Sequence, residues 1–405
     1  MAGAIDFLEG GTVTSVQGFL AGATYAGLKT YAEDKLDLSL LLSEAPCVAA
    51  GVFTTSTIKS PSVNVTQDHL VKGPVRGLVV NAGIANTCVG EQGYKDAEEM
   101  TGLAAERLGV QRREVLVCST GIIGVELPMS LIRDGIQTIE LSQHGGSQLA
   151  RAMMTTDTRP KEVAVTFTLD GKQVRMGGVT KGSGMIHPNM ATMLAFITTD
   201  AAVDRDFLQD TLREVADASF NMLTIDGDTS TNDTLLVLAN GLAANRPITA
   251  GSPDAATFKG ALTEVCVHLT REMARDGEGA TRLIVVEVTG AKDIPDARKA
   301  ARTIASSSLV KSAVFGADPN WGRVLAALGR SAAAVTEDKI DLYINGVCIM
   351  QEGKQIPFHR DAVVVLMRGS EVTFKLNLNL GDGQATAWGC DLTEQYVIIN
   401  SAYST

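Results

Sequence analysis

The sequence lacks the features that mark disulfide-rich, metal-binding or nucleic-acid-binding proteins. Its six cysteines lie far apart without a CxxC pair, and its five histidines show no HExxH spacing. We therefore expect neither a disulfide framework nor a metal site. Lysine and arginine number 35 against 46 acidic residues, which gives a formal net charge of −11. Because no basic stripe offsets this acidity, the sequence predicts no nucleic-acid partner.

Long hydrophobic runs and targeting segments are also lacking. No apolar stretch approaches the ~20 residues that span a bilayer, and the N-terminal MAGAIDFLEGG has no basic region followed by an apolar core. We therefore expect a cytoplasmic protein with no membrane partner. Charged residues make up only 20% and aromatic residues 5% of the chain, whereas hydrophobic residues reach 45% and glycine occupies 40 positions. This composition is typical of a dense α/β enzyme with many tight turns.

The spacing of apolar residues alternates along the chain between the period of strands and that of helices. Short apolar runs predict buried strands at residues 37–50, 51–57, 77–86, 114–119 and 163–169. Amphipathic stretches predict helices at residues 94–108, 129–149, 204–220, 254–275 and 296–310. This order of elements indicates an α/β or α+β fold class.

The last part of the chain predicts a compact unit that is rich in hairpins. The Asn345-Gly346 pair lies between two short apolar runs and is a strong type I′ hairpin signal. Residues 371–380 alternate apolar and polar side chains, and a following Asp-Gly turn predicts a second hairpin with residues 384–390. We expect these strands to form a half-exposed antiparallel sheet.

The most distinctive stretch, GVTKGSGMIHPNMATML, covers residues 178–194. Gly182 and Gly184 make its backbone permissive, and the Ala191-Thr192 bond lies where a buried apolar run begins. A tight turn leading into a core element is one interpretation. Alternatively, cleavage before Thr192 would place an α-amine with a pKa of about 7–8 beside the hydroxyl, and the amine could then act as the base for a threonine nucleophile.

Other catalytic and binding motifs do not fit the chain. Ser183 lies outside a GxSxG elbow. Lys181 precedes Gly182 instead of following the GxxxxG of a phosphate loop, and no Rossmann fingerprint is present. Residues 224–234, TIDGDTSTNDT, resemble a calcium loop, but the glycine and the distal glutamate are misplaced. We reject calcium and assign Asp226 and its neighbours no role beyond supporting the core.

Two further positions carry polar groups with two interpretations each. Thr120-Gly121 ends a predicted strand, where the pair forms a turn or directs a hydroxyl and a backbone N–H at one point, as an oxyanion hole requires. The residues themselves favour the turn. Glu278 lies between two glycines, where it is either accessible to a ligand or paired with Arg282.

Taken together, the motifs resemble those of the ornithine acetyltransferase family, also called the bifunctional arginine-biosynthesis protein. The central string KGSGMIHPNMATML is a specific family signature, and the resemblance spans essentially the whole chain. The other matching segments, in the expected order, are NAGIAN (81–86), CSTGIIG (118–124), TTDT (155–158), TIDGDTSTND (224–233), DGEGATR (276–282), DPNWGR (318–323) and NSAYST (400–405).

The resemblance implies a precursor that cleaves itself between Ala191 and Thr192. The products are an α chain of residues 1–191 and a β chain that starts at Thr192, with two copies of each in a heterotetramer. The implied fold is an αββα layered sandwich. It implies a catalytic core over residues 1–283 and a smaller C-terminal α/β domain over residues 284–405.

The resemblance also implies the reaction. Thr192 takes the acetyl group from N2-acetylornithine as an ester and passes it to glutamate, while the Thr120 side chain and the Gly121 N–H form the oxyanion hole. The substrate contacts carried over from the family are Thr158, Lys181, Thr192, Glu278, Asn400 and Thr405. No cofactor is implied, and the sequence leaves open whether acetyl-CoA serves as a second acetyl donor. By charge, Lys181 suits the substrate α-carboxylate and Glu278 suits the ornithine ammonium group.

Two other functions remain open at this point. A self-processing amidase or aminopeptidase would use the same N-terminal threonine, with water in place of the second amine. A non-enzymatic binding protein would keep the scaffold without being cleaved. The joint presence of Thr192, Thr120, Gly121, Lys181 and Glu278 disfavours the binding protein, whereas only an assay with glutamate separates transferase from hydrolase.

Overall fold

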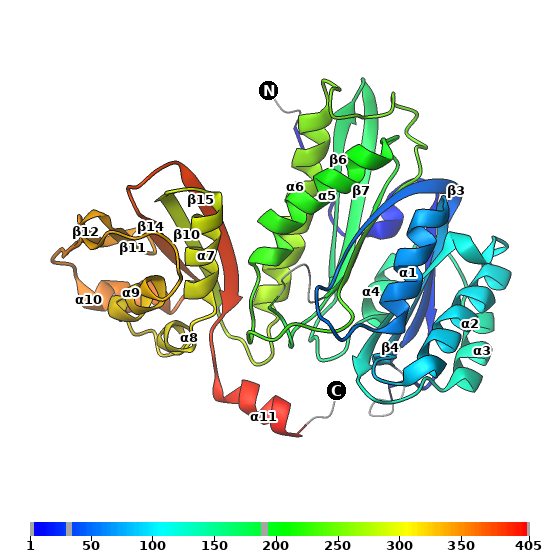
Figure 1. Ribbon diagram of the computed structural model, residues 1–405, viewed down its shortest axis with the longest axis horizontal. Helices are drawn as coiled ribbons and strands as arrows, with labels where there is room; N and C mark the ends of the chain where they lie inside the picture. Colours follow the sequence, from blue (N-terminus) through cyan, green and yellow to red (C-terminus); the bar gives the residue numbers. More distant parts are fainter. Residues whose placement is uncertain (1–3, 30–34, 188–192, 403–405) are drawn as a thin grey trace.

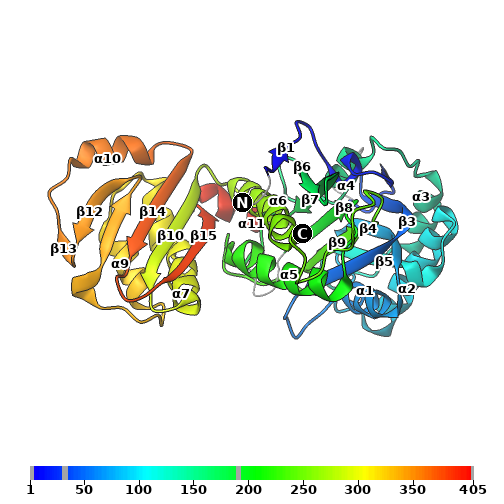
Figure 2. The ribbon, with the colours of Figure 1, turned by 90° about the horizontal axis from the view of Figure 1, so that it is seen from above.

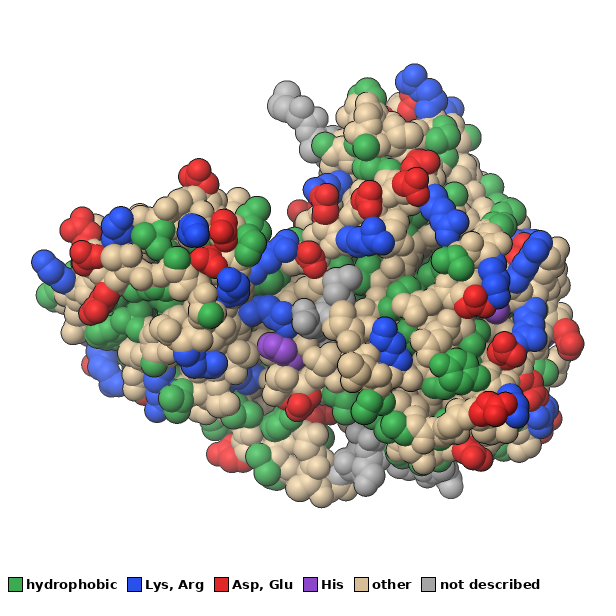
Figure 3. Space-filling model, in the orientation of Figure 1, with side chains coloured by type: hydrophobic (Ala, Val, Ile, Leu, Met, Phe, Trp, Pro, Cys, Tyr) green, Lys and Arg blue, Asp and Glu red, His purple; other side chains and the backbone are tan. Residues whose placement is uncertain are grey.

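The computed structural model describes residues 4–29, 35–187 and 193–402, which form two lobes built on two β-sheets (Figure 1). The smaller lobe begins with β10 (Leu283–Ala291), next to the predicted domain boundary. The space-filling view shows a notch between the lobes, and acidic and basic side chains are intermingled over that face (Figure 3). Within the described ranges, none of the helices combines the length and the apolarity needed to cross a bilayer.

The larger sheet has the strand order β1-β6-β7-β8-β9-β3-β4-β5, and β2 also pairs with β3. Its strands are β1 (Asp6–Phe7), β2 (Phe19–Thr24), β3 (Leu38–Phe53), β4 (Val75–Ile84), β5 (Val115–Ile122), β6 (Lys161–Leu169), β7 (Lys172–Lys181), β8 (Leu194–Thr199) and β9 (Thr234–Ala239). Two short strands were expected at residues 37–50 and 51–57, but β3 is one continuous strand. Its first part pairs with β2 and β4 and its last part with β9, with a register shift after Leu42. This long strand therefore joins two halves of the sheet.

Helices cover the outer faces of these two halves. The helices of the larger lobe are α1 (Pro61–Lys72), α2 (Gly90–Leu108), α3 (Met129–Thr138), α4 (Gly146–Ala152), α5 (Arg205–Ala218) and α6 (Ala255–Arg275), with short 3-10 turns η1 (Val13–Ser15), η2 (Arg112–Glu114) and η3 (Phe220–Met222). One hydrophobic layer lies between α5, α6 and strands β6 to β9, a second between the two sheet halves, and a third between β4, β5 and helices α2 and α3. The structure confirms the predicted α/β fold, with helices outside two sheet layers.

The helices predicted at residues 94–108, 204–220 and 254–275 are confirmed as α2, α5 and α6. Helix α5 follows Asp204, whose carboxylate accepts hydrogen bonds from the backbone N–H groups of Asp206 and Phe207. The single helix predicted at residues 129–149 is wrong, because α3 ends at Thr138 and a separate α4 begins at Gly146. Between them the chain pairs with β2, and a side chain at Gly145 would overlap the β2 backbone. A continuous helix cannot make this backbone contact.

The smaller sheet has the order β13-β12-β11-β14-β10-β15. Besides β10, its strands are β11 (Asp341–Ile344), β12 (Val347–Gln351), β13 (Lys354–Gln355), β14 (Glu371–Asn377) and β15 (Gly383–Cys390). The hairpin predicted at Asn345-Gly346 is confirmed, and both residues have positive φ. The second predicted hairpin is wrong, because β10 lies between β14 and β15 and runs parallel to β14. Most of β10 is buried, as is typical of a central strand that pairs at both edges.

The helices of the smaller lobe pack on this sheet or extend from it. They are α7 (Ile294–Ala305), α8 (Ser308–Phe315), α9 (Trp321–Gly329), the 3-10 turn η4 (Glu337–Lys339), α10 (Arg360–Met367) and α11 (Glu394–Ala402). The helix predicted at residues 296–310 therefore ends early and is followed by a separate α8. Helix α7 packs against β10 and β15. Helix α11 lies beneath the junction of the two lobes (Figures 1 and 2).

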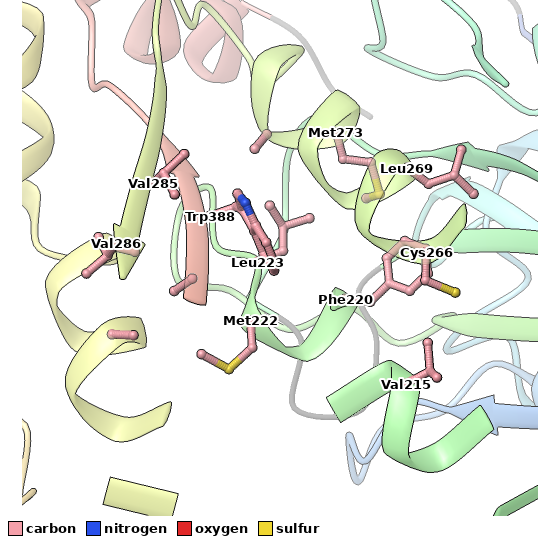
Figure 4. Close-up of a cluster of buried hydrophobic side chains, with 14 of the residues drawn as sticks. Val215, Phe220, Met222, Leu223, Cys266, Leu269, Met273, Val285, Val286 and Trp388 are labelled. Atoms are coloured by element: carbon pink, nitrogen blue, oxygen red, sulfur yellow. The ribbon is translucent and has the colours of Figure 1, made fainter. Parts of the chain in front are cut away.

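The two lobes share one hydrophobic core (Figure 4). Trp388 of β15 and Val285 of β10 lie on one side of it, Leu223 is in the middle, and Met273 of α6 is on the other side. The backbone N–H of Thr224 also donates to the Trp388 carbonyl oxygen at 2.9 Å. This continuous packing holds the residues that follow α6 and β15 close to the strand ends of the larger sheet.

Candidate active site

A cavity beside the ends of β5 and β7 collects most of the residues named from the sequence. The predicted site residues that line it are Thr120, Gly121, Lys181, Glu278 and Asn400. Met193, which follows the predicted nucleophile, also lines this cavity. Ala191, Thr192 and Thr405 lie outside the described residues. The fold thus brings together groups from β5, β7, the turn after α6, and α11.

Thr120 and Gly121 lie near the end of β5, where it runs beside β4. The β4–β5 pairing changes register near Gly83 and Ile84. Gly121 has φ +129°, and a Cβ atom there would overlap the carbonyl group of Gly83, so this close backbone approach requires glycine. The Thr120 hydroxyl oxygen accepts a hydrogen bond from Lys181 Nζ at 3.4 Å. Because Thr120 uses an oxygen lone pair in that bond, its hydrogen can be donated to a developing oxyanion.

Lys181 is a buried cation at the end of β7. Its Nζ donates to the hydroxyl oxygens of Thr155 at 2.7 Å and Thr120 at 3.4 Å. Among the described residues, no carboxylate forms an ion pair with it. Burial lowers the pKa of the Lys181 ammonium, and the negative charge of Asp157 partly offsets this effect. A buried ammonium whose hydrogen bonds to the described residues go to hydroxyls is well suited to bind a substrate carboxylate.

A buried ionic cluster supports Lys181 from behind. Asp157 accepts hydrogen bonds from Lys161 Nζ at 2.6 Å and from the backbone N–H of Gly182 at 2.7 Å. Lys161 Nζ also donates to Asp276 at 2.6 Å. Burial by itself would raise the pKa of Asp157, but the charges of Lys161 and Lys181 and the donated hydrogen bonds hold it well below its usual range. The ionised carboxylate fixes the backbone directly after Lys181.

Thr158 belongs to this supporting cluster and does not line the cavity. Its backbone N–H donates to Asp276 at 3.1 Å, and its hydroxyl donates to the other carboxylate oxygen of Asp276. These bonds tie the loop before β6 to the end of α6, two residues before Glu278. Substrate contact by Thr158 stays a prediction.

Glu278 and Asn400 form the opposite side of the cavity. The buried Glu278 carboxylate accepts a hydrogen bond from the Asn400 side-chain amide at 2.7 Å. A Cβ atom at Gly184 would overlap this carboxylate, so the glycine leaves room for it. The alternative partner considered from the sequence, Arg282, lies near Asp391 at 3.7 Å instead. Glu278 is therefore directed into the cavity.

The polar segment that received no role from the sequence also borders the cavity. Asn232 donates from its side-chain amide to the carbonyl oxygens of Ala85 at 2.6 Å and Ser119 at 2.8 Å. It thereby fixes the chain directly before Thr120. Asp226, in the same segment, holds the approach to the predicted cleavage bond. The only signal in the sequence was an uninterrupted polar run between apolar segments, because the partners of both residues lie far away in the chain.

The charges around the cavity select for one class of molecule. Among the described residues that line it, Lys181 is the only cationic side chain, whereas Asp233 and Glu278 are acidic. A ligand with a carboxylate at one end and an ammonium at the other complements this arrangement. Across the ranges that the structure describes, no group of three His, Cys, Asp or Glu side chains is placed to hold a metal.

Comparisons with known proteins agree along the whole chain. The model of the ArgJ family matches residues 20–405. The arginine biosynthesis bifunctional protein ArgJ of Dehalococcoides mccartyi is 50% identical over 405 residues, 100% of both chains. That of Symbiobacterium thermophilum is 51% identical over 99% of this chain and 100% of its own. The crystal structure of the ArgJ protein of Bacillus halodurans matches with 44% identity and a TM-score of 0.51, covering 51% of this chain and 98% of that chain.

Proposed function

The chain belongs to the ArgJ family of arginine-biosynthesis acyltransferases, and from this premise we propose that it transfers the acetyl group of N2-acetylornithine to glutamate. The observation that carries this proposal is the convergence of Thr120, Gly121, Lys181 and Glu278 on one cavity beside Met193. Two hydrogen-bond donors, a buried cation and a buried acid are the groups that transfer between two amino acids requires.

The enzyme first cleaves itself between Ala191 and Thr192. The match to the Bacillus halodurans chain supports this step, because 98% of that chain covers only 51% of this one. A solved chain about half as long is expected for one product of such a cleavage. Cleavage makes Thr192 an N-terminal residue, whose α-amine has a pKa of about 7–8 and can take the proton of its own hydroxyl.

The Thr192 hydroxyl then attacks the acetyl carbonyl of N2-acetylornithine. The Thr192 α-amine accepts the hydroxyl proton, and the Thr120 hydroxyl and the Gly121 N–H stabilise the negative oxygen of the tetrahedral intermediate. One such donor contributes roughly 3 kcal/mol of transition-state stabilisation. As the carbon–nitrogen bond breaks, the α-amine returns the proton to ornithine, which leaves an acetyl-Thr192 ester. The amine of glutamate attacks this ester in the second half-reaction and regenerates the hydroxyl, so the kinetics are ping-pong.

The cavity recognises both amino acids at their shared end and distinguishes them at the other. Lys181 binds the α-carboxylate of each substrate. Glu278 binds the side-chain ammonium of ornithine. The γ-carboxylate of glutamate needs a donor, and Asn400 supplies one when its amide exchanges the 3.0 Å bond to the Tyr396 carbonyl oxygen for the substrate. Thr158 and Thr405 complete the list of proposed substrate contacts.

The remaining features of the proposal follow from the family. The relatives are named bifunctional, and we propose acetyl-CoA as the second acetyl donor, with no bound cofactor. We propose that the α and β chains stay together, with two of each in a heterotetramer located in the cytoplasm.

The denatured mass of the protein after brief exposure to N-acetylornithine tests the proposal. We expect two fragments that separate before Thr192, with one acetyl group on the fragment that begins at Thr192, and we expect glutamate to remove this group. Replacing N-acetylornithine by acetyl-CoA tests the second donor, and Thr192→Ala is the control that neither cleaves nor acetylates. An intact, unmodified wild-type chain would contradict self-cleavage. Cleavage and acetylation followed by discharge to water, equally fast without glutamate, would identify a hydrolase.

A further inference from the structure

Asp226 has no part in the proposed acetyl transfer, yet it holds the chain that leads to the cleavage bond. One of its carboxylate oxygens accepts a hydrogen bond from the backbone N–H of Met185 at 2.6 Å, and the other accepts from Ile186 at 2.9 Å. Hydrogen bonds to an ionised carboxylate are about twice as strong as neutral ones. Two consecutive residues are thus bound by one side chain.

The segment around Asp226 binds the next residues as well. The backbone N–H of Ile225 donates to the carbonyl oxygen of Ile186 at 2.7 Å. His187 is held at both its side chain and its backbone. Its Nδ1 lies 2.9 Å from the Thr224 hydroxyl, and its carbonyl oxygen accepts from the Thr229 hydroxyl at 2.9 Å. Residues 224–229 therefore form a clamp, named here the 224–229 clamp, around residues 185–187.

The smaller lobe fixes this clamp from its other side. Lys311 of α8 is buried, and its ammonium donates to the carbonyl oxygen of Ile225. Burial raises the pKa of the Tyr396 hydroxyl of α11, and the nearby negative charges of Asp226 and Glu278 raise it further. The smaller lobe therefore holds the 224–229 clamp through a group that takes no part in cleavage. This contact fixes the position of the clamp.

A second anchor lies on the other side of the cleavage bond. The carbonyl oxygen of Met193 accepts from the N–H of Thr234 at 2.8 Å. Leu194 then begins β8, in register with Lys181 of β7 and Thr234 of β9. The chain is thus fixed at residues 185–187 and again from residue 193. The Ala191-Thr192 bond lies between these two anchors.

We infer that Asp226 is a positioning residue for self-cleavage, and this inference rests on the proposed function. In that step the Thr192 hydroxyl oxygen bonds to the Ala191 carbonyl carbon, and the carbon–nitrogen bond between the two residues breaks. The hydroxyl proton goes to the nitrogen, which becomes the α-amine, and water hydrolyses the resulting ester to a carboxylate on Ala191. Attack on the adjacent carbonyl requires a bent peptide, and fixing both ends of a short segment favours that geometry. After cleavage, the same hydrogen bonds connect the two chains.

The variant Asp226→Asn tests this inference, with cleavage followed by denatured mass from synthesis onward. Asparagine keeps the shape but presents an amide donor and removes the charge, and we expect cleavage to slow on the order of tenfold or more. Asp228→Asn is the matched control, because Asp228 is an exposed carboxylate of the same loop. We expect it to cleave at the wild-type rate.

Two more variants separate positioning from general damage. Tyr396→Phe changes the α11 side chain near Asp226 but leaves the two backbone hydrogen bonds from Met185 and Ile186 in place, so we expect unchanged cleavage. Thr229→Val removes one hydroxyl from the exposed edge of the clamp, and we expect cleavage to slow several-fold without loss of folding. In each variant, acetylation by N-acetylornithine is measured per cleaved molecule. We expect the acetylation per cleaved molecule to be the same for Asp226→Asn and Tyr396→Phe. Asp226 does not line the cavity, so the two variants can affect acetyl transfer only by shifting α11.

The outcomes distinguish this inference from the proposed function. Normal cleavage of Asp226→Asn and Thr229→Val beside a cleaved and acetylated wild type would overturn the clamp and leave the proposed function intact. Equal slowing of the Asp226→Asn and Asp228→Asn variants would also overturn it, because loop charge rather than the two backbone hydrogen bonds would then be responsible. A wild type that never cleaves would overturn the proposed function itself.

Discussion

The two sides of the cavity are built from different kinds of structure. On one side, Thr120, Gly121 and Lys181 lie at the ends of strands, and in each strand a run of five buried residues comes directly before the site residues. On the other side, Glu278 lies in a turn and Asn400 lies on α11, a helix with no buried residue among 394–402. We call these the strand wall and the α11 wall.

This difference matches the different demands of chemistry and recognition. Oxyanion donors must be fixed before the reaction, because their benefit disappears if they have to reorganise during it. Groups that bind the variable end of two substrates must accommodate both an ammonium and a carboxylate. Elements with few buried contacts open at lower free energy than buried strands do. We therefore expect changes in the strand wall to lower kcat and changes in the α11 wall to raise KM.

The largest effect is expected from Gly121→Ala in the strand wall. The added Cβ atom would overlap the Gly83 carbonyl group, so β4 and β5 must separate and the proposed oxyanion donors must move. We expect kcat for acetyl transfer to fall more than about 100-fold. The control is Gly124→Ala, which shares a positive φ of +82° but meets no atom within 4 Å. Gly124→Ala should lower the free energy of unfolding by on the order of 1 kcal/mol and leave kcat nearly unchanged. Equal losses of kcat in the two variants would show that the close approach of β4 and β5 is not the cause.

The next largest effect is expected from Thr120→Val, which keeps the branched shape and removes the hydroxyl. We expect kcat to fall about 100-fold with nearly unchanged KM, because the proposed role of the lost hydroxyl is to stabilise the transition state. The rate of acetyl-Thr192 formation in a single turnover measures this directly. A rise in KM at constant kcat would show that Thr120 binds substrate instead, and the distinction between the two walls would then fail.

The sequence predicted the elements whose signals are local. Helix α5 has a capping aspartate and an apolar stripe within one stretch, and the β11–β12 hairpin has its Asn-Gly turn. The second hairpin was wrong because strand order depends on distant partners, here the insertion of β10 between β14 and β15. Local periodicity identifies a strand but does not identify its neighbour.

The site divides in the same way. From its own residues Thr120-Gly121 favoured a simple turn, and the physical requirement for glycine appears only when β4 is placed beside β5. The family resemblance named Lys181, Glu278 and Asn400, whose joint placement in one cavity depends on the tertiary fold. Asp226 received no role because its partners, Met185 and Ile186, lie about 40 positions away.

In the α11 wall, Glu278→Gln tests recognition of the ornithine ammonium. Glutamine keeps the size of the side chain and removes its charge, so we expect the KM for N-acetylornithine to rise about tenfold. The KM for glutamate should stay the same or fall, because a buried carboxylate repels the γ-carboxylate. The two half-reactions are measured separately by acetylation and by deacetylation of the enzyme. An equal rise in both KM values would indicate a structural role for Glu278.

The smallest effect is expected from Asn400→Ala. Asn400 is exposed and contributes one amide hydrogen bond to Glu278, and a single neutral donor is worth about 1 kcal/mol. We expect the KM for glutamate to rise a few-fold at constant kcat. Ser401→Ala is the control on the same helix, because within the described residues its hydroxyl donates to the Ile398 carbonyl oxygen at 3.1 Å and not to a cavity group.

The double variant Asn400→Ala with Glu278→Gln shows whether the α11 wall acts as a unit. The Asn400 amide orients the Glu278 carboxylate, so part of its effect on N-acetylornithine passes through that charge. In the Glu278→Gln background, Asn400→Ala should therefore change the KM for N-acetylornithine less than it does in the wild type. Its effect on the KM for glutamate should persist. Strict additivity for both substrates would mean that the two residues bind independently. A tenfold loss of kcat in Asn400→Ala alone would show that α11 contributes to the chemical step. The strand wall and the α11 wall would then no longer differ in their effects on kcat and KM.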